Sequence, residues 1–388
     1  MPRDELKQPL HQRRLSQRIW ERRPSALTSA YALVIAGFIG GGYWVTKLPM
    51  PYAGEPVITL NVPPIEEIKT ASVEPLPETQ APAPEPVEEV AAEPAKVVEP
   101  ISQQNYQQDA TIYVSANQPL AKAPASGAVE AASFGPLPRI TPQGKKPSEI
   151  YARSVPMGLV HSEAPKIVII LGGMGLNEKL SAKAAKELPA DITLAFAPYG
   201  DNLQAQVDKA RANGHEVMLQ LPLEPVGYPA ANPGPKTLLA DGTDAVNLES
   251  LQWHMSRFTG YTGVVNYMGG RFLSAAPAIK PMLVELKKRG ILFLEDGSLP
   301  LSATDGVAKS MQMQVRRANS VIDLDGNPTS IIAALNLLEE EAKTNGIAIG
   351  TGTGLEATIT TVGEWAKTAA DRGIIILPAS AAFKGRLG

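Results

Sequence analysis

The sequence predicts an α/β fold over residues 165–388, preceded by one transmembrane helix and a disordered Pro/Glu-rich linker. Short apolar, β-branched runs alternate there with helix-like stretches, which is typical of parallel strands joined by crossover helices. Several of these helices end at a glycine, the residue that best adopts the left-handed cap. Seven or eight such units in about 220 residues favour a complete or incomplete barrel over an open doubly wound sheet.

Bulk composition excludes several classes of site. The formal net charge of -3 is too small to indicate a nucleic-acid surface, so we expect no nucleic-acid partner. The chain has no cysteine, which excludes disulfides and thiolate metal sites. It has four histidines, and His11 and His161 precede the first predicted strand of the domain. This number argues against a metal site built from several histidines.

The N-terminal part of the chain predicts a membrane anchor. Residues 1–25 form a basic tail, and residues 26–46 carry no charge. A helix of about 20 residues spans the roughly 30 Å of a bilayer core. A cleaved signal peptide or a buried helix fits less well, because the run is long and no small-residue cleavage site follows it. The positive-inside rule then predicts a single-pass protein of the bacterial inner membrane, with a cytoplasmic N-terminus and a periplasmic C-terminal domain.

Residues 47–164 predict a disordered linker. This stretch is rich in Pro, Ala and Glu, and such a composition buries too little apolar surface to offset the entropy of ordering. Its carboxylates and prolines favour an extended chain, so we expect a long spacer. A Pro-rich ligand for a partner protein is the alternative interpretation of the same stretch.

The folded domain is predicted to contain eight strands and six helices. The strands are Lys166–Leu171, Ile192–Phe196, Glu216–Leu221, Gly263–Asn266, Leu292–Glu295, Val321–Asp323, Ile347–Gly350 and Ile374–Leu377. The helices are Asn177–Glu187, Asn202–Asn213, Leu248–Phe258, Ala278–Arg289, Thr329–Asn345 and Thr358–Arg372.

The carboxyl ends of these strands predict the site, because parallel strands place them at one edge of the sheet. Two strand ends are rich in glycine, at Gly172-Gly173-Met174-Gly175 and at residues 350–354. Neither is a nucleotide motif. Glu178 stands where the dinucleotide fingerprint needs its third glycine, and the later segment lacks the Lys-Ser/Thr of a P-loop.

Polar side chains at other strand ends are the remaining candidates. Glu224 and Arg271 lie in loops and are either simply solvated or part of the site. Glu295 and Asp296 are adjacent, so their side chains point to opposite faces and only one of them faces the site. A paired-carboxylate mechanism therefore has no clear second member. We expect structural roles for His215 and His254, and no nucleophile elbow of the Gly-x-Ser-x-Gly type is present.

Several ordered segments resemble the divergent polysaccharide deacetylase family, a branch of the polysaccharide deacetylase superfamily. The resemblance covers essentially the whole folded domain and implies a distorted (β/α) barrel of the deacetylase type. It also implies a carbohydrate role in the periplasm or at the cell surface. The segments that carry it are Ile192–Tyr199, Gly214–Val217, Leu221–Pro225, Asn232–Leu239, Gly260–Phe272 and Arg289–Leu294.

In active members of the superfamily, the resemblance implies a divalent ion held by Asp and His that assists hydrolysis of an acetyl group. This chain departs from that pattern. Gly172 and Gly173 stand at the two aspartates, Gln220 at one histidine and Thr351 within the late Gly-His-Pro-His segment. Glycine offers no ligand, and Gln or Thr is a weak ligand beside imidazole, so we expect neither a metal nor another cofactor.

We therefore expect a catalytically degenerate, deacetylase-like protein of the cell envelope that binds a polysaccharide or peptidoglycan-type glycan or acts as a scaffold. The residues expected to line its cleft are Glu224, Asn266, Arg271, Glu295 and Asp296. One rival is an active deacetylase that uses Glu224 and Asp296 in a remodelled site. A second rival is a protein-interaction module that works through its linker.

Overall fold

The computed structural model of the protein describes residues 117–384. The predicted basic tail, the predicted anchor at residues 26–46 and most of the predicted linker lie outside the described residues. Within the part that is described, no helix is long and apolar enough to cross a membrane.

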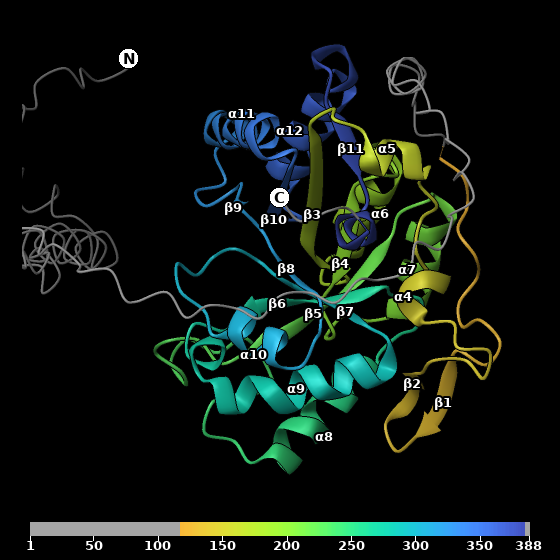
Figure 1. Ribbon diagram of the computed structural model, residues 1–388, viewed down its shortest axis with the longest axis vertical. Coiled ribbons are helices and arrows are strands. Elements are labelled where there is room, and N and C mark those ends of the chain that lie inside the picture. Colours follow the sequence, from red (N-terminus) through yellow and green to blue (C-terminus); the bar gives the residue numbers. More distant parts are fainter. Residues whose placement is uncertain (1–116, 385–388) are drawn as a thin grey trace, which may run out of the picture. The chain divides into compact units, whose positions relative to one another are not determined.

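A parallel sheet forms the centre of the folded domain (Figure 1). Apolar and β-branched residues dominate its strands, and eight of the nine residues of the first long strand are buried, as expected for a sheet covered on both faces. Its strands are β3 (Lys166–Met174), β4 (Thr193–Phe196), β5 (Val217–Leu223), β6 (Gly263–Met268), β7 (Leu292–Glu295), β8 (Val315–Arg317), β9 (Ser320–Val321), β10 (Ile347–Thr353) and β11 (Ile375–Leu377).

The order of the strands brings the two edges of the sheet together into a ring. Neighbours follow the order β8-β7-β6-β5-β4-β3-β10-β9, and β11 pairs with the start of β3. The two ends of this order are consecutive in the chain. The amide of Ala318 donates to Glu295 of β7 at 2.8 Å, and the amide of Asn319 donates to Ile349 of β10 at 2.7 Å. One extended segment thus joins both edges, and the predicted α/β fold with a parallel, barrel-like sheet is confirmed.

Helices cover the outside of this sheet, and Figure 1 shows α8 and α9 together on one side and α11 and α12 together on another. Two of them begin at an asparagine N-cap, since the side chain of Asn177 accepts from the amide of Leu180 and the side chain of Asn327 accepts from the amide of Thr329. The helices are α6 (Glu178–Glu187), α7 (Leu203–Ala212), α8 (Asp244–Met255), α9 (Ala276–Arg289), α10 (Thr304–Ser310), α11 (Pro328–Asn345) and α12 (Glu356–Lys367), with 3-10 turns η2 (Phe272–Ser274), η3 (Ala370–Arg372) and η4 (Ala379–Phe383).

Two apolar clusters follow from the alternation of side chains along the strands. One cluster lies between strands and helices and includes Ile167, Ile169 and Leu171. The other lies inside the ring, with Ile170, Val265 and Leu294 among its members. Residues of η4 and of a short helix, α5 (Met157–His161), belong to the inner cluster and fill the end of the ring where the strands begin.

Residues 117–164 are folded, which corrects the prediction that the linker extends to residue 164. This segment contains a hairpin of β1 (Val129–Ala132) and β2 (Gly135–Pro138), the helix α4 (Pro147–Ile150) and α5. Tyr151 is 1% exposed, and the guanidinium of Arg211 in α7 lies 5.1 Å from the centre of its ring. The Arg211 side chain also donates to the carbonyls of Tyr151 and Ala121. These contacts are distant in sequence, so local composition does not reveal them.

A buried carboxylate joins this segment to the end of the chain. Glu216 accepts from the amide of Arg153 at 2.8 Å and from the amide of Ser380 at 3.0 Å. The hydroxyl of Ser380 donates to the same carboxylate. Glu216 is fully buried at the start of β5, so the N-terminal segment and η4 are held together beneath the ring.

Several predicted element boundaries are wrong. β3 continues through both glycines to Met174, because Gly172 still pairs with Thr353 of β10 and Met174 pairs with Phe196 of β4, while the register shifts between Leu171 and Met174. The predicted strand at Val321–Asp323 overlaps β9 only at Val321, and β8, earlier in the chain, was not predicted. The helix α10 was not predicted, and α8 begins at Asp244, ahead of the predicted Leu248, because Thr243 caps it there.

Candidate functional site

A cavity of about 390 Å³ opens at the carboxyl ends of the strands, above the inner apolar cluster. Ile170, Ala195 and Val265 belong to both, so they form its floor. Polar and small residues from β3, β5, β6, β10 and the loop after β7 surround it: Gly172, Gly173, Gln220, Asn266, Asp296, Ser298, Thr351, Gly352 and Thr353. Rings and aliphatic side chains complete the mouth: Leu176, Pro198, Tyr199, Pro222, Pro233, Tyr267 and Leu324.

The side chain of Gln220 fills the space beside Gly172. A Cβ atom added at Gly172 would lie 2.8 Å from Cδ of Gln220 and closer still to its Nε2. The Gln220 carboxamide is fixed there because its Oε1 accepts from the amide of Gly173 at 2.6 Å. Gly173 itself has φ of +74°, a left-handed conformation that favours glycine. The absence of a side chain at residue 172 and the position of Gln220 therefore depend on each other.

Asp296 follows β7 and faces the cavity. Its Oδ1 accepts from the amide of Ser298 at 3.0 Å and from the hydroxyl of Ser298 at 2.7 Å. The Asp296 amide donates to Oδ1 of Asn266 at 2.8 Å, and the Asp296 carbonyl accepts from the hydroxyl of Thr351 at 2.6 Å. Asn266 also donates to the carbonyl of Met268, so this buried amide fixes the ends of β6 and β7.

The glycine-rich strand ends use their amides within the protein. The amide of Gly175 donates to the hydroxyl of Ser181 at 2.9 Å, and the amide of Gly354 donates to the carbonyl of Gly172 at 2.7 Å. The amide of Thr353 donates to the carboxylate of Asp323 at 2.7 Å. These donors are engaged, so they do not form an open cradle for an anion.

Glu224 and Arg271, both predicted to line the cleft, form an ion pair and do not line the cavity. Nη1 of Arg271 lies 2.5 Å from Oε1 of Glu224, and Nη2 pairs with the carboxylate of Asp241. Oε2 of Glu224 accepts from the amide of Ala240 at 2.6 Å. Glu224 is 2% exposed and lies past the end of β5, where its contacts hold three loops together.

Glu295, the other predicted cleft residue, points away from the cavity. The prediction that Glu295 and Asp296 face opposite ways agrees with the structure, in which Asp296 lines the cavity and Glu295 does not. Glu295 is 2% exposed, and burial raises its pKa above the ordinary value. Nε of Arg317 lies 3.6 Å from its carboxylate and offsets part of this effect.

Comparisons with known proteins decide the family. Residues 169–383 match the sequence model of the divergent polysaccharide deacetylase family, which is more than half of the chain. The chain belongs to this family. The uncharacterized protein YibQ of Escherichia coli (strain K12) is 22% identical over 197 residues, 50% of this chain and 60% of that protein. The chain thus matches less than two thirds of the length of this curated relative.

Two solved structures are similar to this chain to different degrees. The crystal structure of the uncharacterized protein ATU2773 from Agrobacterium tumefaciens C58 has a TM-score of 0.62 and 41% identity, covering 64% of this chain and 99% of that chain. The catalytic domain of peptidoglycan N-acetylglucosamine deacetylase from Eubacterium rectale ATCC 33656 has a TM-score of 0.37 and 12% identity, covering 59% and 93%. This second similarity is too low to support an argument.

The residues present do not fit the divalent metal of active deacetylases. Gly172 and Gly173 have no ligand atoms, and Oε1 of Gln220 is engaged by the amide of Gly173. The hydroxyl of Thr351 donates to a backbone carbonyl. Among the described residues, no three His, Cys, Asp or Glu side chains gather closely enough to hold a metal ion.

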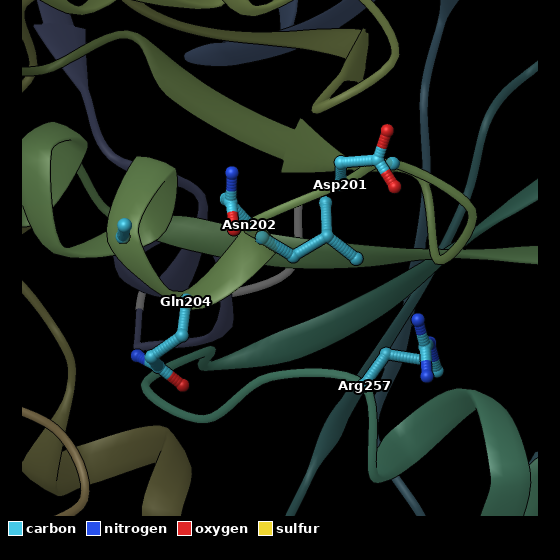
Figure 2. A pocket seen from close by; sticks show the side chains of 7 residues that line it. Asp201, Asn202, Gln204 and Arg257 are labelled. Carbon is cyan, nitrogen blue, oxygen red and sulfur yellow. The ribbon is translucent and has the colours of Figure 1, made fainter.

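A second cavity, of about 480 Å³, lies beside the start of α7 (Figure 2). Figure 2 shows Asp201 and Asn202 where the chain enters α7, and Arg257 on a separate segment. Nε of Arg257 donates to the carbonyl of Pro198 at 3.1 Å, and the guanidinium lies 4.9 Å from the ring centre of Trp253. This cavity is open, and its lining contains one acidic and one basic side chain, Asp201 and Arg257.

Sequence reasoning missed Leu176, Pro233 and Leu324 at the mouth of the cavity. Leu176 and Leu324 are 61% and 86% exposed, which is unusual for large apolar side chains beside a cavity. Each of the two follows a strand end, but a single leucine in a loop carries no distinguishing pattern. Pro233 lies in the Asn-Pro-Gly-Pro stretch that marks the family, and its place in the wall became evident only from the fold.

Proposed function

We propose that this divergent polysaccharide deacetylase binds a glycan of the cell envelope and has lost metal-dependent hydrolysis. The observation that carries the proposal is the fit of Gln220 against Gly172. A carboxylate at residue 172 would need the space that the Gln220 carboxamide fills. Catalytic groups of this kind typically contribute ~10²–10⁴-fold each, so the exchange of several removes most of the rate enhancement.

The lining of the cavity supports a sugar ligand. Tyr199, Tyr267 and the proline rings offer flat apolar faces, while Gln220, Asn266 and Asp296 supply a few polar groups. Sites for small molecules commonly combine apolar walls with a few polar groups that fix orientation. A peptidoglycan-type glycan or an exopolysaccharide presents both the ring faces and the hydroxyl groups that such a site needs.

The proposed location is the periplasmic face of the inner membrane. The charge-free residues 26–46 and the basic residues before them support a single-pass anchor. The 70 residues from 47 to 116 that connect this anchor to the described domain would span about 45 Å as a flexible coil. Such a tether would let the domain reach a glycan layer beside the membrane.

Sedimentation with insoluble peptidoglycan tests the proposal. Purified full-length protein in detergent micelles is expected to sediment with the glycan. Tyr267→Ala removes a partly exposed ring of the cavity and should weaken binding about tenfold, the effect of about 1.4 kcal/mol of lost contact. Leu337→Ala, an exposed apolar residue of α11 outside the cavity lining, is the matched control and should bind as the wild type does.

Two outcomes would contradict the glycan-binding proposal. Equal binding by the Tyr267→Ala and wild-type proteins would place any glycan contact elsewhere. Stoichiometric Zn, Co or Mn together with release of acetate would favour an active hydrolase with a remodelled site. The ion pair of Glu224 with Arg271, outside the cavity, does not favour that alternative.

A further inference from the structure

Within residues 117–384, Asp296 is the only charged side chain that lines the cavity at the carboxyl ends of the strands. Its Oδ1 accepts two hydrogen bonds from Ser298. No hydrogen bond or ion pair to its Oδ2 is found in the described part of the chain. Asp296 is partly buried, and its carboxylate places a negative charge in an otherwise uncharged lining.

Two arginines of the described residues, Arg271 and Arg317, pair with carboxylates outside the cavity. Arg271 pairs with Glu224 and Asp241 outside the cavity. Arg317, in β8, lies 3.6 Å from the carboxylate of Glu295, which points away from the cavity. No described cation of the lining neutralises Asp296, so a positively charged group on a ligand would complete the pair.

We propose that the ligand carries a primary ammonium group that pairs with Asp296, and that it is a glycan with free amino groups in place of N-acetyl groups. This inference rests on the proposed glycan-binding function and specifies its ligand class. The apolar floor of Ile170, Ala195 and Val265 lowers the local dielectric, which strengthens an ion pair in the cavity.

Gln220 adds a second polar contact. Its Oε1 is used by the amide of Gly173, and its Nε2 lies over Gly172 at the wall of the cavity. An amide N–H group donates to hydroxyl or ring oxygens, so it suits a sugar and not a second ammonium group. The negatively charged acceptor of Asp296 and the neutral N–H donor of Gln220 together favour an amino sugar over a sugar that carries a carboxylate.

The selection follows from charge. An N-acetylated sugar is neutral, so it would supply no positive charge to pair with the partly buried carboxylate of Asp296. We expect a preference of about 10- to 100-fold for the free amine, which is about 1.4–2.8 kcal/mol and lies within the contribution of hydrogen bonds to charged groups. A ligand with a carboxylate beside the binding position would be repelled by Asp296.

Calorimetric titration of the full-length protein in detergent micelles, with matched tetrasaccharides, tests this inference. The probes are a glucosamine tetrasaccharide and its fully N-acetylated counterpart, compared at mildly acidic pH. We expect the glucosamine form to bind about 10- to 100-fold more tightly. Asp296→Asn should remove this preference, because asparagine retains an oxygen for Ser298 and loses the charge.

The control variant is Asp305→Asn, which removes an equal charge from an exposed position on α10 and should retain the preference. Equal or tighter binding of the N-acetylated tetrasaccharide would overturn the inference while leaving glycan binding intact. Tighter binding of a tetrapeptide containing lysine would also overturn it, in favour of a peptide amine. If neither tetrasaccharide nor insoluble peptidoglycan binds, both the inference and the proposed function fail.

Discussion

Gln220 determines what the wall of the cavity presents beside β3. Its side chain occupies the space next to Gly172 and is held by the amide of Gly173. A methyl group at residue 172 would displace the carboxamide and break this hydrogen bond. We therefore expect Gly172→Ala to destabilise the fold by about 1–3 kcal/mol, through overpacking and the lost bond.

A double-mutant cycle measured by urea unfolding checks the dependence of the two residues. In a Gln220→Ala background the space is empty, so adding the methyl group at residue 172 should cost less than about 0.5 kcal/mol. If Gly172→Ala lowers the free energy of unfolding equally in the wild-type and Gln220→Ala backgrounds, the two residues are independent and the described packing of Gln220 against Gly172 is contradicted.

His254 makes the stability of the fold depend on pH. The side chain is fully buried between Tyr199 and Trp253, and its Nε2 donates to the carbonyl of Lys236 at 2.8 Å. Burial lowers the pKa of His254 from 6.5 to about 4. Below pH 6.5 the unfolded chain takes up a proton that the folded protein excludes, so stability is full above this pH and falls toward pH 4.

The expected loss at His254 is about 3 kcal/mol, at about 1.4 kcal/mol for each pKa unit. His254→Gln should remove most of it in urea unfolding measured between pH 4 and 7. Part of the slope should remain, because burial also lowers the pKa of His215. An unchanged slope in His254→Gln would contradict the assignment.

At the scale of elements, the segment 117–164 is an integral part of the domain. The Tyr151 hydroxyl accepts from the amide of Ala125 at 3.0 Å, and its ring contacts Arg211. We expect Tyr151→Phe to cost about 1 kcal/mol, because it loses only the hydrogen bond. Tyr151→Ala should cost about 3–5 kcal/mol, because it also removes a buried ring.

Denaturant midpoints and limited proteolysis of residues 117–150 measure this effect. The alanine variant should expose the segment to protease before the rest of the domain unfolds. Equal stability of the Tyr151→Phe and Tyr151→Ala proteins would mean that the segment contributes little to the fold.

The strand ends were the most predictable part of the site. Gly172, Gln220, Asn266, Asp296 and Thr351 were candidates from sequence, and all line the cavity. The reason is geometric, since parallel strands bring their carboxyl ends to one edge whatever the loops do. The binding roles of these residues remain predictions.

Positions beyond the strand ends could not be predicted in the same way. Glu224 lies one residue after β5, where the chain has left the sheet, and its direction depends on its pairing with Arg271. The fold of residues 117–164 was missed because its contacts are distant in sequence. The carbonyl of Tyr151 accepts from Arg211 in α7, and Arg153 donates to the carbonyl of Gly214 in the loop between α7 and β5. A proline-rich composition conceals such long-range contacts.

At the scale of the whole molecule, the chain keeps a closed parallel sheet with a cavity at the ends of its strands. The ring of strands closes through the backbone of Ala318 and Asn319. At the end of the ring where the strands begin, the Glu216 carboxylate accepts from the amides of Arg153 and Ser380 and so joins the N-terminal segment to η4. These features maintain a cavity with a fixed shape. Within the described residues, they do not bring together the side chains that would hold a catalytic metal.

We propose that this cavity binds a glycan without hydrolysing its acetyl groups. The most direct measurement is release of acetate from an N-acetylated tetrasaccharide by the full-length protein, supplied in turn with Zn²⁺, Co²⁺ and Mn²⁺. We predict no release above that of the metal ions alone. Catalytic release that is lost in the Asp296→Asn protein would contradict the account.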